Sequence, residues 1–177
     1  MHRTGFWLRA LATGIDFFIL LVFYIVSTLV LEVDPEARDP RANAGSLYVW
    51  GVLIAAFWMA LTLFEIFFAA TPGKLILGRR IANANGTKAL RSTLCVRWFA
   101  KNFGGLLLLT EAITLVKGFR IIAGFSNAVV AMGCLMALGE TKQTWHDQWA
   151  GTAVFRKREV MEPPPGPQMI RGVAPPT

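Results

Sequence analysis

The chain has 177 residues, of which 54% are hydrophobic and only 16% are charged, and its formal net charge is +7. This length fits one domain of ordinary size, and the hydrophobic content excludes a chain that is disordered throughout. A basic excess combined with an apolar excess indicates a membrane protein, with the lipid bilayer as its partner and no nucleic acid, because cations collect on the cytoplasmic side of a bilayer.

The first long apolar stretch covers residues 6–31 and is interrupted by Arg9, Asp16 and a few small polar residues. As a helix it would extend roughly 39 Å, which is enough to cross a bilayer with some tilt. The stretch is longer than the apolar core of a typical signal peptide, and no small-x-small cleavage site follows it. We therefore predict a retained transmembrane helix.

A polar linker with Pro35 and Pro40 leads to a second apolar stretch, residues 47–70, whose one ionisable residue is Glu65. This second stretch would extend roughly 36 Å as a helix, so it is also predicted to span the membrane.

Residues 71–102 form a polar interval with seven cations and no acid. Thr71-Pro72 is typical of a helix start, and the strand-like run 78–83 leads into an Asn85-Gly86 turn. Residues 91–102 alternate apolar residues with cations, which suits an amphipathic helix lying in the membrane interface.

Residues 103–116 are apolar but too short to cross alone, so the third span is predicted at 97–116 with its basic residues reaching the interface. A short turn leads to a fourth apolar stretch, residues 121–139. The predicted fold is an all-α membrane protein: a small bundle of four transmembrane helices with an amphipathic cytoplasmic segment and a short β element. In the alternative, residues 103–116 are re-entrant or lie on the surface, and only three helices cross.

The distribution of cations predicts the orientation. With both termini and residues 71–102 in the cytoplasm, 14 of the 18 Lys and Arg residues lie inside, as expected for a multi-pass protein of the inner (cytoplasmic) membrane. A membrane domain of residues 1–158, with cytoplasmic segments 71–96 and 140–158, would precede a disordered cytoplasmic tail. That tail, residues 159–177, contains six of the nine prolines.

Charges inside the predicted spans are candidate functional groups, because they are costly in a bilayer and seldom left unpaired. Asp16 and Glu65 fall in the same half of the bilayer, where two acids could share a proton or bind a cation. Structural pairing with Arg9, Lys74 or a cytosolic arginine is an equal alternative. Glu111 is interpreted as structural or as a partner of Lys117.

A second cluster covers residues 143–152 and contains His146 and Asp147. Without a nearby nucleophile this pair is weak evidence for catalysis, and we expect no enzyme. Asp147 is placed to accept bonds from the arginines of residues 71–102, and residues 151–155 could form a strand that pairs with 78–83. We expect Cys95 and Cys134 to be free thiols, and we expect no cofactor and no His-rich metal site.

The chain resembles the RDD family of bacterial membrane proteins in three blocks, FWLRALATGIDFFILL (6–21), TPGKLILGRRIANANG (71–86) and QTWHDQWAGTAVF (143–155). The family is named for one arginine and two aspartates, and Arg9, Asp16 and Asp147 occupy these positions. The resemblance implies a small helical membrane domain of poorly defined activity. Transport of unknown ligands is the usual suggestion, and some members look like sodium/proton antiporters.

The leading hypothesis is a protein that moves a cation or a small solute, coupled to protons. Asp16 would be the protonatable or cation-binding carboxylate, assisted by Glu65, while Arg9 would tune its pKa and Asp147 would fasten the cytoplasmic residues to the basic interval. A homo-oligomer is expected, because four helices enclose little polar volume. The main alternative is a non-transporting membrane scaffold or assembly partner, and a weaker one is an enzyme that uses His146 and Asp147.

Overall fold

The computed structural model describes residues 2–32, 44–114 and 118–161. The described part is mostly helical, with four long helices, two short ones and two short strands. In chain order the elements are α1 (Phe6–Val30), α2 (Ala44–Phe68), α3 (Pro72–Ile76), β1 (Arg79–Asn83), α4 (Arg91–Thr114), α5 (Gly118–Leu135), the 3₁₀ turn η1 (Met136–Leu138), α6 (Trp145–Trp149), β2 (Thr152–Arg156) and the 3₁₀ turn η2 (Lys157–Glu159).

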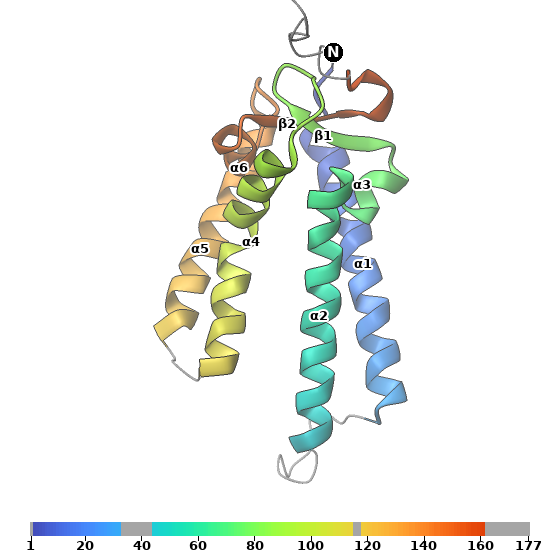
Figure 1. Ribbon diagram of the computed structural model, residues 1–177, viewed down its shortest axis with the longest axis vertical. Helices are drawn as coiled ribbons and strands as arrows, with labels where there is room; N and C mark the ends of the chain where they lie inside the picture. Colours follow the sequence, from blue (N-terminus) through green and yellow to red (C-terminus); the bar gives the residue numbers. More distant parts are fainter. Residues whose placement is uncertain (1, 33–43, 115–117, 162–177) are drawn as a thin grey trace, which may run out of the picture.

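The long helices form two hairpins, α1 with α2 and α4 with α5 (Figure 1). The hairpins converge at the end of the molecule that carries the sheet, where α2 packs against α4, and they spread apart toward the other end. We call the sheet, together with α3, α6 and residues 2–4, the cap. The cap therefore lies where the two hairpins meet.

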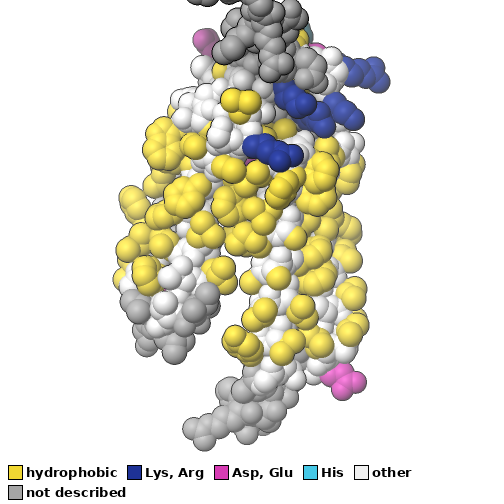
Figure 2. Space-filling view, viewed as in Figure 1, with side chains coloured by type: hydrophobic (Ala, Val, Ile, Leu, Met, Phe, Trp, Pro, Cys, Tyr) yellow, Lys and Arg dark blue, Asp and Glu magenta, His cyan; other side chains and the backbone are white. Residues whose placement is uncertain are grey.

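Among the described residues, three helices are long and apolar enough to cross a membrane: Phe6–Val30, Gly45–Phe68 and Gly118–Leu138. Large apolar side chains such as Phe17, Leu29 and Ile121 are exposed on α1 and α5. Figure 2 shows hydrophobic side chains along the helices and Lys and Arg side chains near the cap. Contiguous apolar surface of this extent is characteristic of contact with lipid, so the fold is that of a membrane protein.

The third predicted span needs a correction at its start. The helix α4 begins at Arg91 rather than near residue 97, and the amphipathic stretch 91–102 is its first half instead of a separate interface helix. Arg91, Arg97, Lys101 and Glu111 lower its hydropathy, and α4 is not one of the three apolar candidates. The four-span bundle therefore stays a prediction.

The predicted pairing of the two strand-like runs is confirmed. Strands β1 and β2 are antiparallel, and Ile81 lies opposite Val154. Ile81, Leu94 and Val154 pack together in the core of the cap. The N-terminal residues join it as well, since the Thr4 backbone N–H donates to the Val154 carbonyl oxygen at 2.7 Å. The N-terminal residues are thereby fixed to strand β2, which lies far away in the sequence.

Several predicted features fall outside the described residues: most of the polar linker (33–43), Lys117, and residues 162–177 of the predicted tail. Residues 159–161 are described, and they contact residue 2 of the cap and the segment between β1 and α4. The Lys88 backbone N–H donates to the Met161 carbonyl oxygen at 2.9 Å, and the His2 backbone N–H donates to the Glu159 carboxylate at 2.9 Å.

Candidate functional site

The centre of the site is Arg97 on α4, which is almost fully buried. Its Nε donates to the Asp147 Oδ1 at 2.7 Å, and its Nη1 pairs with the Glu65 Oε1. Asp147 belongs to α6 and Glu65 belongs to α2. One guanidinium group therefore connects three helices.

Asp147 also forms an ion pair with a second arginine, which belongs to α1. Arg9 Nη1 pairs with the Asp147 Oδ2, and the Thr144 backbone N–H donates to the same oxygen at 3.2 Å. Burial by itself would raise the pKa of Asp147, but the Arg97 and Arg9 guanidinium groups hold that pKa well below its usual range. Asp147 is therefore an anion at neutral pH, and the predicted bond to an arginine of residues 71–102 is present.

Glu65 is fully buried and is paired with three cations. Lys74 Nζ and Lys101 Nζ each lie 3.2 Å from its Oε2, in addition to the Arg97 contact. The structural pairing of Glu65 with Lys74 that the sequence allowed is thus observed. Burial lowers the pKa of Lys74 to about 8, so its ammonium group is still protonated at neutral pH.

Asp16 is half-buried and lies away from Arg9's partners. Its Oδ1 accepts a hydrogen bond from the Gly73 backbone N–H at 2.7 Å, so a side chain of α1 caps the start of α3. The expectation that Arg9 tunes the pKa of Asp16 finds no contact to support it, because Arg9 pairs with Asp147 and donates to the Thr4 and Lys142 carbonyl oxygens.

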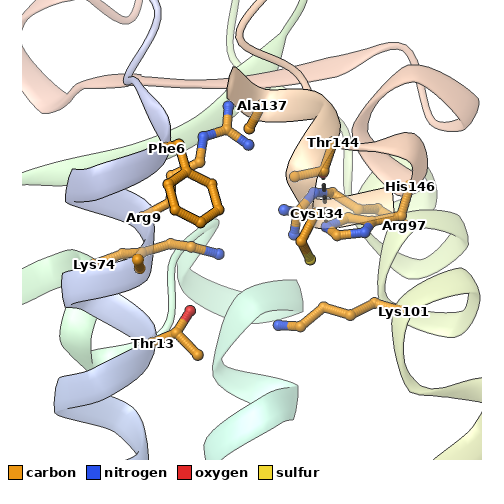
Figure 3. A pocket seen from close by; sticks show the side chains of 11 residues that line it. Phe6, Arg9, Thr13, Lys74, Arg97, Lys101, Cys134, Ala137, Thr144 and His146 are labelled. Atoms are coloured by element: carbon orange, nitrogen blue, oxygen red, sulfur yellow. Dashed lines mark hydrogen bonds between the residues drawn. The ribbon is translucent and has the colours of Figure 1, made fainter. Parts of the chain in front are cut away.

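Two neighbouring cavities formed by described residues share Lys74 and Lys101. The central cavity has a volume of about 330 Å³, and Figure 3 shows Lys74 and Lys101 extending into it from opposite sides. Its lining includes Arg9, Lys74, Arg97, Lys101, Thr144 and His146. The second, of about 220 Å³, shares Lys74 and Lys101 with it and contains Asp16. We call the second one the Asp16 cavity.

His146 lies in the wall of the central cavity and is 4% exposed. Its Nε2 is 3.0 Å from the Thr144 Oγ1, a bond drawn in Figure 3. Burial and the Arg97 charge lower the pKa of His146 to about 2, so the ring is neutral at physiological pH. Its Nδ1 has no hydrogen-bond partner among the described residues.

Glu111 and Cys95 do not line the central cavity, whereas Cys134 does. Glu111 pairs with Arg120 at 3.0 Å, whereas its predicted partner Lys117 lies outside the described residues. Cys95 and Cys134 are free thiols. Within residues 2–32, 44–114 and 118–161 there is no group of three or more His, Cys, Asp or Glu side chains that could bind a metal ion.

Sequence reasoning missed the roles of Arg97 and Lys101. A usable signal was present, because these two cations are four residues apart and therefore share one face of α4. Glu65 was predicted near the same end of the bundle, and it is the carboxylate that this face meets. By contrast, no sequence pattern pointed to the contacts of residues 2–4.

Comparison with known proteins agrees with the family resemblance of the three sequence blocks. A model of the RDD family matches residues 3–151, which include every residue named above as lining the two cavities. The uncharacterized protein YckC of Bacillus subtilis (strain 168) is 26% identical over 151 residues, which is 85% of this chain and 82% of that protein. No solved structure matches the chain.

Proposed function

The chain belongs to the RDD family, and from this premise we propose that it moves a small solute across the cytoplasmic membrane. The observation that carries the proposal is the central cavity, where buried charged side chains from both hairpins meet. Ionisable groups inside a helical membrane bundle typically mark the path of a substrate or an ion. We further propose four spans with both termini in the cytoplasm. We also propose a homo-oligomer, because one four-helix bundle encloses little polar volume.

The lining of the central cavity favours a small solute over a metal cation as the cargo. Four cations line it, and the nearby Glu65 is already paired with three of them. A cation entering this cavity would be repelled by the lining and would find no unpaired carboxylate there.

Asp16 is the proposed site of proton coupling. It is half-buried, lines the Asp16 cavity together with Lys74 and Lys101, and takes no part in the ion pairs that join Arg9, Asp147, Arg97 and Glu65. A carboxylate in such a place can exchange a proton as a solute arrives or leaves.

The experiment compares Asp16→Asn with Asp16→Ala in everted membrane vesicles that hold a preformed pH gradient. Asparagine can still accept the Gly73 N–H but cannot carry a proton, whereas alanine loses both roles. Sodium, potassium, lithium, phosphate and acetate are added in turn at matched protein abundance. The expected result is that one solute dissipates the gradient in wild type and in neither variant.

The alternative is a non-transporting scaffold, and the ion pairs that join α1, α2, α3, α4 and α6 are the observation that favours it. If the protein is a scaffold, no solute should dissipate the pH gradient. Asp16→Asn should then be as abundant as wild type, and Asp16→Ala should be less abundant. We propose no catalytic role for His146 and Asp147, because an imidazole with a pKa of about 2 is too weak a base to accept a proton at neutral pH.

A further inference from the structure

The charges around the central cavity do not cancel. Arg9, Lys74, Arg97 and Lys101 line it, and the carboxylates paired with these four cations are Asp147 and Glu65. These four cations outnumber their two paired carboxylates by two, and Asp16 of the neighbouring cavity, which also acts on Lys74 and Lys101, leaves a surplus of one positive charge. Burying an uncompensated charge is costly, so an arrangement of this kind favours a bound anion.

The excess positive charge is located at the two lysines. Lys74 Nζ and Lys101 Nζ both donate to the same oxygen of Glu65, each at 3.2 Å. An ammonium group has three N–H donors, and each of these two has one acceptor among the described residues. Both groups extend into the cavity from opposite sides (Figure 3) and have donors left for a ligand placed between them.

His146 adds a neutral donor on the same wall. When the Thr144 hydroxyl donates to Nε2, the imidazole carries its proton on Nδ1, and this nitrogen has no partner within the described part of the chain. The lowered pKa of His146 keeps the ring in this neutral form. An anion in the cavity would give Nδ1 an acceptor.

We propose that the central cavity binds a phosphate group between Lys74 and Lys101. A phosphate group is an anion with several strong acceptor oxygens, so it suits the positively charged lining and can accept from donors that converge from several sides, where a carboxylate offers two oxygens only. The phosphate could belong to a free or phosphorylated solute, which carries between one and two negative charges at neutral pH, or to the phosphodiester of an anionic lipid headgroup, which carries one, since the cavity lies at the end of the bundle where the cap begins. This inference rests on the proposed function, because it names the class of solute for the cavity assigned there.

The first arm of the test measures binding of inorganic phosphate by calorimetry at constant ionic strength. The full chain is placed in nanodiscs of phosphatidylcholine, and Lys101→Met is compared with Lys157→Met, an exposed residue of η2 that removes the same charge outside the cavity. We expect the dissociation constant to rise at least tenfold in Lys101→Met and to stay within twofold of wild type in Lys157→Met. Lys101→Arg keeps the charge and should bind.

The second arm uses nanodiscs that contain phosphatidylglycerol, with native mass spectrometry to count the lipids that stay bound. Retention of this lipid by wild type and Lys157→Met but not by Lys101→Met, with no binding of inorganic phosphate, identifies a lipid headgroup as the ligand. Binding in the first arm identifies a soluble phosphate.

Two results would overturn the inference: no binding of either probe to wild type, or equal binding by Lys101→Met and Lys157→Met. Loss of folding does not blur the outcome, because Lys101→Met removes a surplus cation and should melt at or above the wild-type temperature without ligand. Measurements of flux and of phosphate binding test the transport proposal and the phosphate site independently. Phosphate binding without flux retains the site and removes the transport proposal, whereas flux without phosphate binding does the reverse.

Discussion

Arg97 organises the site because a guanidinium group presents several donors in one rigid plane. Two of its nitrogens contact carboxylates on different helices, Asp147 on α6 and Glu65 on α2. A lysine ammonium is a compact charge on a flexible stem, so it would not hold the two carboxylates in one fixed arrangement. The rigid geometry of one side chain therefore sets the distance between α2, α4 and α6 at the cap end.

The neutral His146 makes stability depend on pH. Its folded pKa of about 2 lies below the unfolded value of about 6.5, so below pH 6.5 the unfolded chain binds a proton that the folded chain does not. The contribution of the neutral His146 to the free energy of unfolding is therefore fully present above pH 6.5 and is lost as the pH falls. Between pH 7.5 and pH 5 the expected loss is about 2 kcal/mol. Thermal melting in detergent micelles across this range measures it.

His146→Gln is the matched control, because glutamine keeps polar atoms at the site but does not titrate. Its melting temperature should fall less between pH 7.5 and pH 5 than that of wild type. Arg97, Asp147, Lys101 and Lys74 act on the ring from the neighbouring elements, and all four are kept in His146→Gln, so the difference between the two proteins reports on the imidazole. Equal pH dependence in wild type and His146→Gln would refute the assignment.

The pairing of single residues was only partly predictable. Asp147 was matched to the arginines of residues 71–102, because that interval contains seven cations and no acid of its own. The Glu65–Lys74 pair was also accessible, since nine residues separate the two across a helix break. The Arg9–Asp147 pair spans 138 residues, and the Asp16–Gly73 bond involves a backbone group, so neither leaves a local pattern.

At the level of elements, the short helix α3 depends on a close approach to α1. A methyl group added at Gly73 would meet the Ala12 carbonyl oxygen and would lie 3.1 Å from the Asp16 Oδ1. We expect Gly73→Ala to cost about 1–3 kcal/mol, because backbone atoms would have to move. The loss should appear as a lower melting temperature and lower membrane abundance.

Gly14→Ala is the control for this substitution, because nothing lies within 4 Å of a methyl group at Gly14 in α1. Alanine also favours a helix interior over glycine, so Gly14→Ala should be neutral or slightly stabilising. Tolerance of alanine at both positions would show that α3 can move away from α1 without loss.

The elements themselves followed sequence patterns where those patterns were local. The strands β1 and β2 were predicted from the strand-like runs 78–83 and 151–155, and the structure adds that Gly78 adopts a positive φ of 62° just before β1. The start of α4 was placed too late, because Arg97 and Lys101 were interpreted as residues at a membrane edge. Both are instead paired with buried carboxylates within a continuous helix. The bond from Thr4 to Val154 involves only backbone atoms, so no side-chain pattern predicts it.

The molecule as a whole is predicted to cross the membrane four times. Cys95 is exposed on α4 near the cap, and Gly118 lies at the start of α5, at the opposite end of the hairpin (Figure 1). With the cap in the cytoplasm, a membrane-impermeant maleimide should label Cys95 in inverted vesicles only. Gly118→Cys, made in a chain with Cys95 and Cys134 replaced by serine, should be labelled in right-side-out vesicles only.

Labelling of both positions from the same side would show that α4 does not cross and would support the three-span alternative. Gly118 suits this test because nothing lies within 4 Å of an added Cβ. Labelling of Cys95 only in right-side-out vesicles would instead reverse the orientation that the distribution of cations predicts.

The wide separation in sequence between Arg9 and Asp147 sets the order in which the protein can be completed during synthesis. Arg9 leaves the ribosome 138 residues before its carboxylate partner, and Thr4 waits longer still for Val154. The first helix must therefore enter the translocon with its arginine unpaired. The cluster closes only when nearly all of the described chain has been made, so a nascent chain stopped before α6 would expose unmatched charges to the machinery that degrades unfinished membrane proteins.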